Sequence, residues 1–244
     1  MIPKVIHYCW FGRGAMPAIA HSCLASWKKF LPDYELRLWN EDTFDVNSIP
    51  YIKEAYEARK FAFVADYIRL YALYTYGGIY MDSDVEVVKN LDGLLNLPGF
   101  SGFESAVDVP TGIIATQQYN EWAKEQLACY EDRHFRLPDG TYDTTTNVTI
   151  ISTQMAANGF QLNNTYQVYK NSIHIFPQDY FCAKSRTAVI TITENTYCIH
   201  HFAGSWQPVR IKIKKFIFHK IVGPKFTDVL VKFKRKYYTP LFAK

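Results

Sequence analysis

Apolar and polar positions along the first hundred residues change repeatedly between a short extended pattern and a longer helical one. The predicted strands are residues 5–10, 34–39 and 79–81, and the predicted helices are residues 19–30, 52–60 and 62–76. Such alternation predicts an α/β fold with a Rossmann-like, mainly parallel central sheet, whose ligands bind at the carboxyl ends of the strands. Further along, the pattern predicts strands at 100–104 and 112–116 and helices at 121–130 and 148–157.

One of these helices, residues 62–76, is apolar on nearly all sides and ends before the pair Gly77-Gly78, where a glycine C-cap is expected. Its only full charges are Asp66 and Arg69, which share a face because they are three residues apart. Two interpretations stay open. The pair is a buried ion pair, or it faces a cleft where Asp66 accepts a hydrogen bond from a sugar or base and Arg69 meets a phosphate.

Two carboxylates, Asp82 and Asp84, follow the short strand 79–81 in the segment GGIYMDSDVEV. Residues two apart on an extended segment point the same way, so both side chains are expected to converge on one cation. Hard oxygen ligands suit Mg²⁺ or Mn²⁺, which in turn suits a diphosphate. The D-x-D spacing alone is weak, and the alternative is an acidic turn after a strand.

The longer run FVADYIRLYALYTYGGIYMDSD resembles the DXD-containing sugar-binding region of glycosyltransferase family 32, to which bacterial capsular polysaccharide transferases and yeast mannosyltransferases belong. The opening IPKVIHYCWFG and the late CIHHFAGSW also resemble that family. The resemblance implies a GT-A fold, a nucleotide-sugar donor, a divalent cation and retention of anomeric configuration. It implies catalytic roles for Asp82 and Asp84, and donor-binding roles for Trp10, Asp66, Arg69, Tyr80, Asp82, Ser205 and Trp206.

The late segment YCIHHFAGSW contains two adjacent histidines, His200 and His201. On an extended segment they face opposite ways, so at most one of them meets a metal. His201, followed by Phe-Ala-Gly, resembles the late H-x-x-G element of several retaining GT-A families, which makes it the expected third metal ligand after Asp82 and Asp84. Nothing upstream fixes which histidine it is. The hydroxyl-rich run 141–149 has two readings as well: it caps the helix that follows, which we favour, or it lines a sugar or acceptor pocket.

Charge divides the chain unevenly. Residues 209–244 hold 11 Lys and Arg and one acid, a net +10, whereas the remainder holds 16 basic and 22 acidic residues, a net −6, and the two sum to +4. The bases alternate with Ile, Phe, Val and Tyr. This pattern predicts a basic amphipathic helical tail at 209–244 that binds an anionic membrane surface. The resemblance implies that the preceding residues, 1–208, form a GT-A glycosyltransferase domain. Nucleic acid is an alternative partner, which no recognition motif supports.

The five cysteines are odd in number and lack C-x-x-C spacing, which argues against a disulfide framework or a zinc site and suits a reducing compartment. No signal peptide or membrane-spanning apolar run is apparent. The expected location is therefore the cytoplasmic face of the membrane, where the protein is peripherally bound.

The leading hypothesis is a retaining glycosyltransferase that uses Mn²⁺ or Mg²⁺. It moves a hexose or N-acetylhexosamine from a nucleotide sugar, UDP-linked by preference with GDP-mannose as the other choice, to a hydroxyl of a lipid-linked capsular or surface polysaccharide. One alternative is transfer to a protein acceptor. A second is a haloacid-dehalogenase-type phosphatase, although Glu86 stands where that family has Thr or Val. The third is a non-enzymatic membrane or nucleic-acid binding protein, which leaves Asp66, Arg69, Asp82, Asp84 and His201 without a common purpose.

Overall fold

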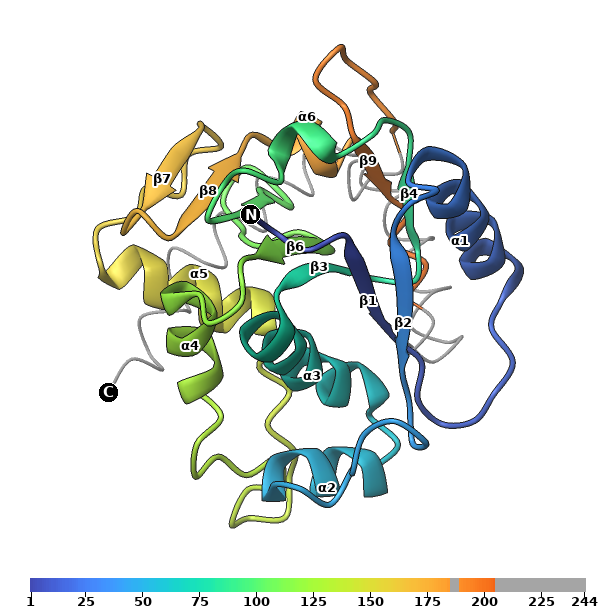
Figure 1. The fold of residues 1–244 in the computed structure, drawn as a ribbon. Helices are drawn as coiled ribbons and strands as arrows, with labels where there is room; N and C mark the ends of the chain where they lie inside the picture. Colours follow the sequence, from blue (N-terminus) through green and yellow to red (C-terminus); the bar gives the residue numbers. More distant parts are fainter. Residues whose placement is uncertain (185–188, 205–244) are drawn as a thin grey trace, which may run out of the picture. The chain divides into compact units, whose positions relative to one another are not determined.

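A computed structural model of the chain describes residues 1–184 and 189–204 (Figure 1). The expected tail at 209–244, and the expected donor-binding residues Ser205 and Trp206, lie outside these ranges. Met1–Ala203 forms one compact unit. Its strands are β1 (Val5–Cys9), β2 (Glu35–Trp39), β3 (Gly78–Met81), β4 (Val85–Val87), β5 (Gly99–Gly102), β6 (Ile113–Thr116), β7 (Gln167–Tyr169), β8 (Ile173–Phe176) and β9 (Cys198–His200). Its helices are α1 (Ala18–Phe30), α2 (Pro50–Glu57), α3 (Phe61–Tyr76), the 3₁₀ turn η1 (Asp92–Leu94), α4 (Glu121–Ala128), α5 (Asn147–Ala157) and α6 (Gln178–Phe181).

Seven strands form the central sheet in the order β2-β1-β3-β6-β5-β8-β7, and β4 pairs with β9 in a separate two-stranded sheet. β1 is parallel to both β2 and β3, and β5 is parallel to β8, whereas β6 and β7 run antiparallel to their neighbours. The expected α/β class is confirmed, in the form of a mixed sheet. In its parallel part, β1 and β2 run toward the lower side of Figure 1, where α2 lies.

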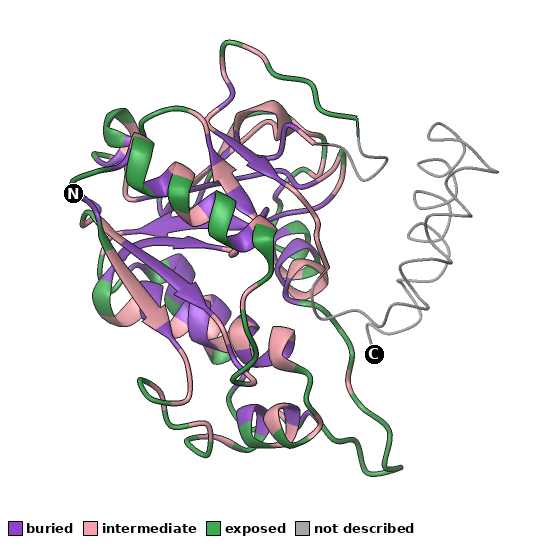
Figure 2. Cartoon of the chain, turned by 90° about the vertical axis from the view of Figure 1, so that its right-hand side faces the viewer, coloured by how far each residue is buried: buried purple, intermediate pink, exposed green. Residues whose placement is uncertain are grey.

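Both faces of the sheet are covered, and alternate side chains of β3 show how. Tyr80 joins a core with residues of α2, α3, α4 and α5. Its neighbours Ile79 and Met81 join a second core with residues of α1, β4 and α6. In Figure 2 most strands are accordingly buried, although the edge strand β2 is only partly so, while the outer faces of the helices are exposed. A strand buried on both faces has no polar alternation, which is why β3 is apolar throughout.

Local signals explain where the helices nearest the candidate site begin and end. α3 ends at Gly77, whose N–H donates to the Leu73 carbonyl oxygen. α5 begins after Thr146, whose hydroxyl accepts a hydrogen bond from the Thr149 N–H, so the capping interpretation of the 141–149 run is confirmed. All five cysteines are free. Within the described ranges, no helix has the length and apolar character of a membrane span.

Candidate active site

The two aspartates lie where β3 leaves the sheet. The Asp82 N–H donates to the Gly112 carbonyl oxygen at 2.8 Å, and the Val85 N–H donates back to the Asp82 carbonyl oxygen at 2.9 Å. Residues 82–85 therefore form a tight turn between β3 and β4. The carboxylates of Asp82 and Asp84 do converge, but the turn brings them together, and the extended alternation expected from the sequence does not.

A histidine from the other end of the chain completes this cluster. β9 pairs antiparallel with β4, which sets His200 opposite Val85. Its Nε2 lies 3.4 Å from Asp84 Oδ1 and 3.8 Å from Asp82 Oδ2. Among the described residues, Asp82, Asp84 and His200 form a group whose ligand atoms all lie within 4.8 Å of one another. Two carboxylates and an imidazole fit Mn²⁺ or Mg²⁺, and they leave the other octahedral positions to phosphate oxygens and water.

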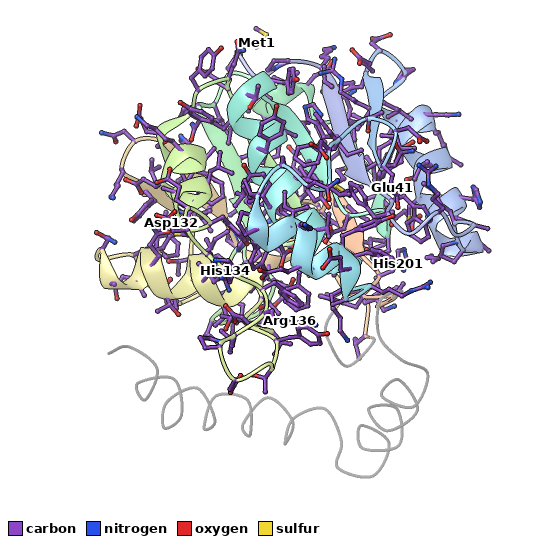
Figure 3. All side chains as sticks on the ribbon, turned by 90° about the horizontal axis from the view of Figure 1, so that it is seen from below. Met1, Glu41, Asp132, His134, Arg136 and His201 are labelled. Atoms are coloured by element: carbon purple, nitrogen blue, oxygen red, sulfur yellow. The ribbon has the colours of Figure 1, made fainter. Side chains whose placement is uncertain are left out.

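His201, the histidine expected at this site, lies elsewhere. Its Nε2 is 2.8 Å from Glu86 Oε2, and neither aspartate side chain is its partner. Successive side chains on a strand point to opposite faces, so a shift of one residue exchanges the two imidazoles. The structure thus corrects the expected register: His200, not His201, accompanies Asp82 and Asp84. Figure 3, which shows the molecule from below, labels His201.

Hydrogen bonds keep Asp84 ionised in spite of its burial. Burial by itself would raise the pKa of Asp84, but the bonds from His200 and from the Ala203 N–H outweigh burial and lower the pKa to about 2. The Ala203 N–H lies 2.7 Å from Asp84 Oδ2. Burial likewise opposes the charge of His200, and its carboxylate partners outweigh it and raise its pKa. The cluster is therefore a negative site with a fixed geometry.

The space around the cluster depends on a residue without a side chain. A Cβ added at Gly112 would lie 3.0 Å from Asp82 Oδ2 and 3.0 Å from His200 Cε1. Gly112 precedes β6 directly, and its carbonyl oxygen also holds the Asp82 N–H. The close approach of this backbone to the carboxylate and the imidazole explains why glycine occupies the position.

Arg69 links the helix charges to the D-x-D segment. Its Nη2 lies 3.0 Å from Asp66 Oδ1 and 3.3 Å from Asp82 Oδ1, and its guanidinium lies 4.7 Å from the Tyr80 ring centroid. The Tyr80 hydroxyl donates to the same Asp82 oxygen at 3.0 Å. Burial opposes the charge of Arg69, but Tyr80 and the two carboxylates outweigh it and raise its pKa. The ion pair expected within the helix thus extends to the site, and Arg69 and Tyr80 orient Asp82.

Asp66 lies on α3 and is buried against the start of α5. The Asn147 N–H donates to Asp66 Oδ2 at 3.2 Å, and the Asn147 side-chain amide donates to the Asp66 carbonyl oxygen and to the Tyr130 hydroxyl. Burial raises the pKa of Asp66 to about 6, even though Arg69 and the Asn147 N–H act against it. Asn147 Oδ1 is buried and has no hydrogen-bond partner among the described residues. One signal in the sequence pointed to Asn147, namely the hydroxyl-rich run 141–149 that contains it.

Trp10 follows β1 directly. β1 and β3 are parallel with His7 opposite Tyr80, so two residues further along, Cys9 comes next to Asp82. Trp10 therefore lies at the same edge of the sheet as the aspartates, as expected. Its indole Nε1 donates to the Gly14 carbonyl oxygen at 2.6 Å, and the side chain remains partly exposed.

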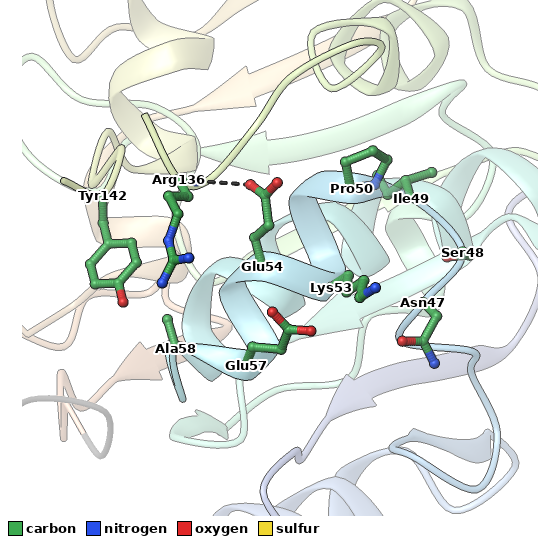
Figure 4. A pocket seen from close by; sticks show the side chains of 10 residues that line it. All are labelled: Asn47, Ser48, Ile49, Pro50, Lys53, Glu54, Glu57, Ala58, Arg136 and Tyr142. Carbon is green, nitrogen blue, oxygen red and sulfur yellow. Dashed lines mark hydrogen bonds between the residues drawn. The ribbon is translucent and has the colours of Figure 1, made fainter. Parts of the chain in front are cut away.

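A pocket of about 510 Å³ lies beside α2, and Figure 4 shows its lining. The first turn of α2 contributes Pro50 and Lys53, and the opposite wall contributes Arg136 and Tyr142. Glu54 holds this wall in place, because its carboxylate accepts hydrogen bonds from the Arg136 N–H and the His134 ring. The aspartates are not among the lining residues, so this pocket and the acidic cluster are different features of the molecule.

Part of the chain is similar in sequence to known proteins. Over 103 residues the chain is 34% identical to inositol phosphoceramide mannosyltransferase 3 of Schizosaccharomyces pombe, covering 41% of this chain and 29% of that protein. It is 32% identical over 120 residues to mannosyl phosphorylinositol ceramide synthase CSH1 of Saccharomyces cerevisiae, covering 46% and 30%. The chain thus spans less than a third of the length of these relatives. The solved PaToxG glycosyltransferase is similar with 19% identity and a TM-score of 0.48, over 63% of this chain and 67% of that one.

Residues 17–100 match the family described as "Glycosyltransferase sugar-binding region containing DXD motif". The matched range contains α3 and both aspartates of the cluster. The GT-A type of α/β fold implied by the resemblance agrees with the sheet described above. The resemblance to glycosyltransferase family 32 is therefore confirmed for this part of the chain, which has the DXD-containing sugar-binding region of glycosyltransferases.

Proposed function

We propose that the protein is a metal-dependent, retaining glycosyltransferase that moves a sugar from a nucleotide donor to a hydroxyl of a glycan acceptor. The observation that carries this proposal is the convergence of Asp82, Asp84 and His200 within 4.8 Å, in a chain whose residues 17–100 match a glycosyltransferase family. A buried strand that leads into paired carboxylates contributes little to stability, because like charges repel unless a cation joins them. A cation-binding role accounts for their placement.

Each residue of the site has a role in this proposal. Asp82, Asp84 and His200 would hold the divalent cation, and Asp82 would also bind the ribose or sugar. The cation, when bound, neutralises the negative charge that develops on the departing diphosphate. Arg69 fixes the orientation of Asp82, and Asp66 accepts a hydrogen bond from the donor. With retention, the departing phosphate oxygen itself accepts the proton of the acceptor hydroxyl, so no separate protein base is required.

The identity of the donor and acceptor forms the finer part of the proposal. The transferred group is a hexose or N-acetylhexosamine, and the acceptor is a lipid-linked surface polysaccharide. One relative is named as an inositol phosphoceramide mannosyltransferase. GDP-mannose is therefore an alternative donor to UDP-sugars, and a phosphoinositol lipid is an alternative acceptor to the polysaccharide.

A donor panel tests the proposed reaction. The full chain is incubated with UDP- and GDP-sugars, with Mn²⁺, with Mg²⁺ and with EDTA, and release of UDP or GDP is measured with and without glycan acceptors. We expect nucleotide release that requires the cation. The release should be lost in Asp84→Asn. The matched control is Asp33→Asn, since Asp33 is an exposed acid far from Asp82 and Asp84 in the sequence. Release of inorganic phosphate from phosphate monoesters, with no cleavage of any nucleotide sugar, would instead favour the phosphatase alternative.

The basic segment 209–244 is proposed to hold a domain of residues 1–208 at an anionic membrane surface, on the cytoplasmic side where the acceptor lipid is presented. Each Lys or Arg near such a surface contributes about 1 kcal/mol, an attraction that salt weakens. Co-sedimentation with anionic and neutral vesicles compares the full chain with a chain that ends at Gln207. Equal binding by the two chains, or indifference to lipid charge, would contradict this part of the proposal.

A further inference from the structure

The loop that follows β1, residues 10–14, has a backbone conformation that few residues adopt. Gly12 has a φ of +93° and Arg13 a φ of +55°, both in the left-handed region. A Cβ at Gly12 would lie 2.3 Å from Cε2 of the Phe61 ring, so the loop packs tightly on the start of α3. Such a conformation persists only when surrounding groups fix it.

Glu41, in the connection between β2 and α2, supplies that restraint. Its Oε1 accepts a hydrogen bond from the Gly12 N–H at 2.6 Å and another from the Tyr56 hydroxyl at 2.9 Å. One carboxylate oxygen thus joins the β1 loop to α2. Hydrogen bonds to an ionised acceptor are about twice as strong as neutral ones, which suits a single point of attachment. Figure 3 labels Glu41 on the same side of the view as His201.

The restrained loop begins beside the acidic cluster. The parallel register of β1 and β3 brings Cys9 next to Asp82, and residues 10–14 continue from there. The loop also closes on itself, because the Trp10 indole donates to the Gly14 carbonyl oxygen at 2.6 Å. In an α/β sheet, ligands bind in the crevice outside the carboxyl ends of such strands. A nucleotide held by Asp82 and Asp84 would therefore meet this loop.

We infer that Glu41 is a positioning residue, which holds the loop 10–14 in the conformation that receives the nucleotide of the donor. Glu41 acts through the Gly12 N–H and does not touch the reacting atoms. This inference rests on the proposed function, because a nucleotide must be the ligand. It predicts an effect on donor binding that is separate from the chemical step.

The test compares Glu41→Ala and Glu41→Gln with the unchanged chain. KM for the donor and kcat are measured, together with the affinity for UDP and GDP by calorimetry in Mn²⁺. Glu41→Ala should raise KM and weaken nucleotide binding about tenfold while kcat changes less than twofold. Glu41→Gln keeps an oxygen acceptor for both hydrogen bonds and should stay within about threefold of the unchanged chain. Glu57→Ala, which removes an exposed glutamate of α2, is the matched control.

The outcomes separate this inference from the proposed function. Failure of the unchanged chain to bind either nucleotide overturns both proposals. Nucleotide binding by Glu41→Ala with unaltered affinity overturns only the role of Glu41, as does a loss in Glu41→Gln as large as in the alanine variant. If Glu41→Ala does not fold, Gly12→Ala decides: its Cβ displaces the loop from Phe61 without altering Glu41, and the same rise in KM without a fall in kcat is expected.

Discussion

Replacing Gly112 with alanine alters the candidate cation site without removing any of its side chains. The added Cβ would lie 3.0 Å from Asp82 Oδ2, from His200 Cε1 and from Val85 Cγ2. These separations are a few tenths of an ångström shorter than ordinary contacts, so all three neighbours must move together. Gly112 is not in the left-handed region, so the effect is steric. Two of the three proposed ligands are among the atoms that move.

The magnitude follows from these contacts. Overpacking of this kind costs about 1–3 kcal/mol of stability. Displacement of the reacting geometry by up to 1 Å costs as much as about 10²-fold in rate, so a loss of about 10- to 100-fold in kcat is expected. Cation binding is the more specific readout. A cation at 100 times its Kd stabilises the fold by about 2.7 kcal/mol, and a tenfold weaker Kd reduces this to about 1.4 kcal/mol.

The assay is urea unfolding with and without Mn²⁺, combined with the rate of nucleotide release. Gly93→Ala serves as the control, since a Cβ there meets nothing within 4 Å. The control should keep the full Mn²⁺ increment in stability and the full rate. An alanine at position 112 that leaves both the Mn²⁺ increment and the rate unchanged would refute the placement of the cation between Asp82 and His200.

Three further predictions concern single side chains. Asp84→Asn should lower transfer at least about 100-fold while circular dichroism stays native; full activity would contradict the assigned role. His200→Ala should raise the Mn²⁺ concentration needed for half-maximal activity several-fold, whereas His201→Ala should change it little; the reverse order in a Mn²⁺ titration would restore His201 as the ligand. His7 is buried against the Gly77 carbonyl oxygen, and burial lowers its pKa from 6.5 to about 4. The unfolded chain therefore binds the proton first, so stability should fall by up to about 3 kcal/mol as pH drops from 6.5 toward 4. That loss should shrink in His7→Gln. If the urea midpoint falls by the same amount between pH 7 and pH 4.5 in both chains, His7 does not cause the loss.

The sequence predicted the first half of the fold well, because its signals are local. The expected helix at 62–76 is α3 (Phe61–Tyr76), and the expected strands at 5–10 and 34–39 are β1 and β2 within one residue at each end. Apolar periodicity and the Gly77-Gly78 breaker define these elements without reference to distant residues. Their parallel pairing followed from the alternation of strands with helices.

The remainder depended on pairing between distant segments, which local patterns do not encode. β4 and β9 are three residues long, too short for a periodic signal, and only their pairing sets His200 beside the aspartates. A one-residue difference in register decides between His200 and His201, and the adjacent histidines look alike in the sequence. The turn at 82–85 was missed for a similar reason, since Asp-Ser-Asp suits both a turn and a strand end.

The hydrogen bond from the Ala203 N–H to Asp84 joins residues 119 positions apart. During synthesis on the ribosome, more than a hundred further residues must therefore be added after Asp84 before its partner Ala203 emerges. A fragment cut to the family-matched range 17–100 would contain both aspartates but no histidine of the cluster. A bound cation would then act as a crosslink between early and late parts of the polypeptide, and its removal should expose the β9 segment to proteolysis before the sheet itself unravels.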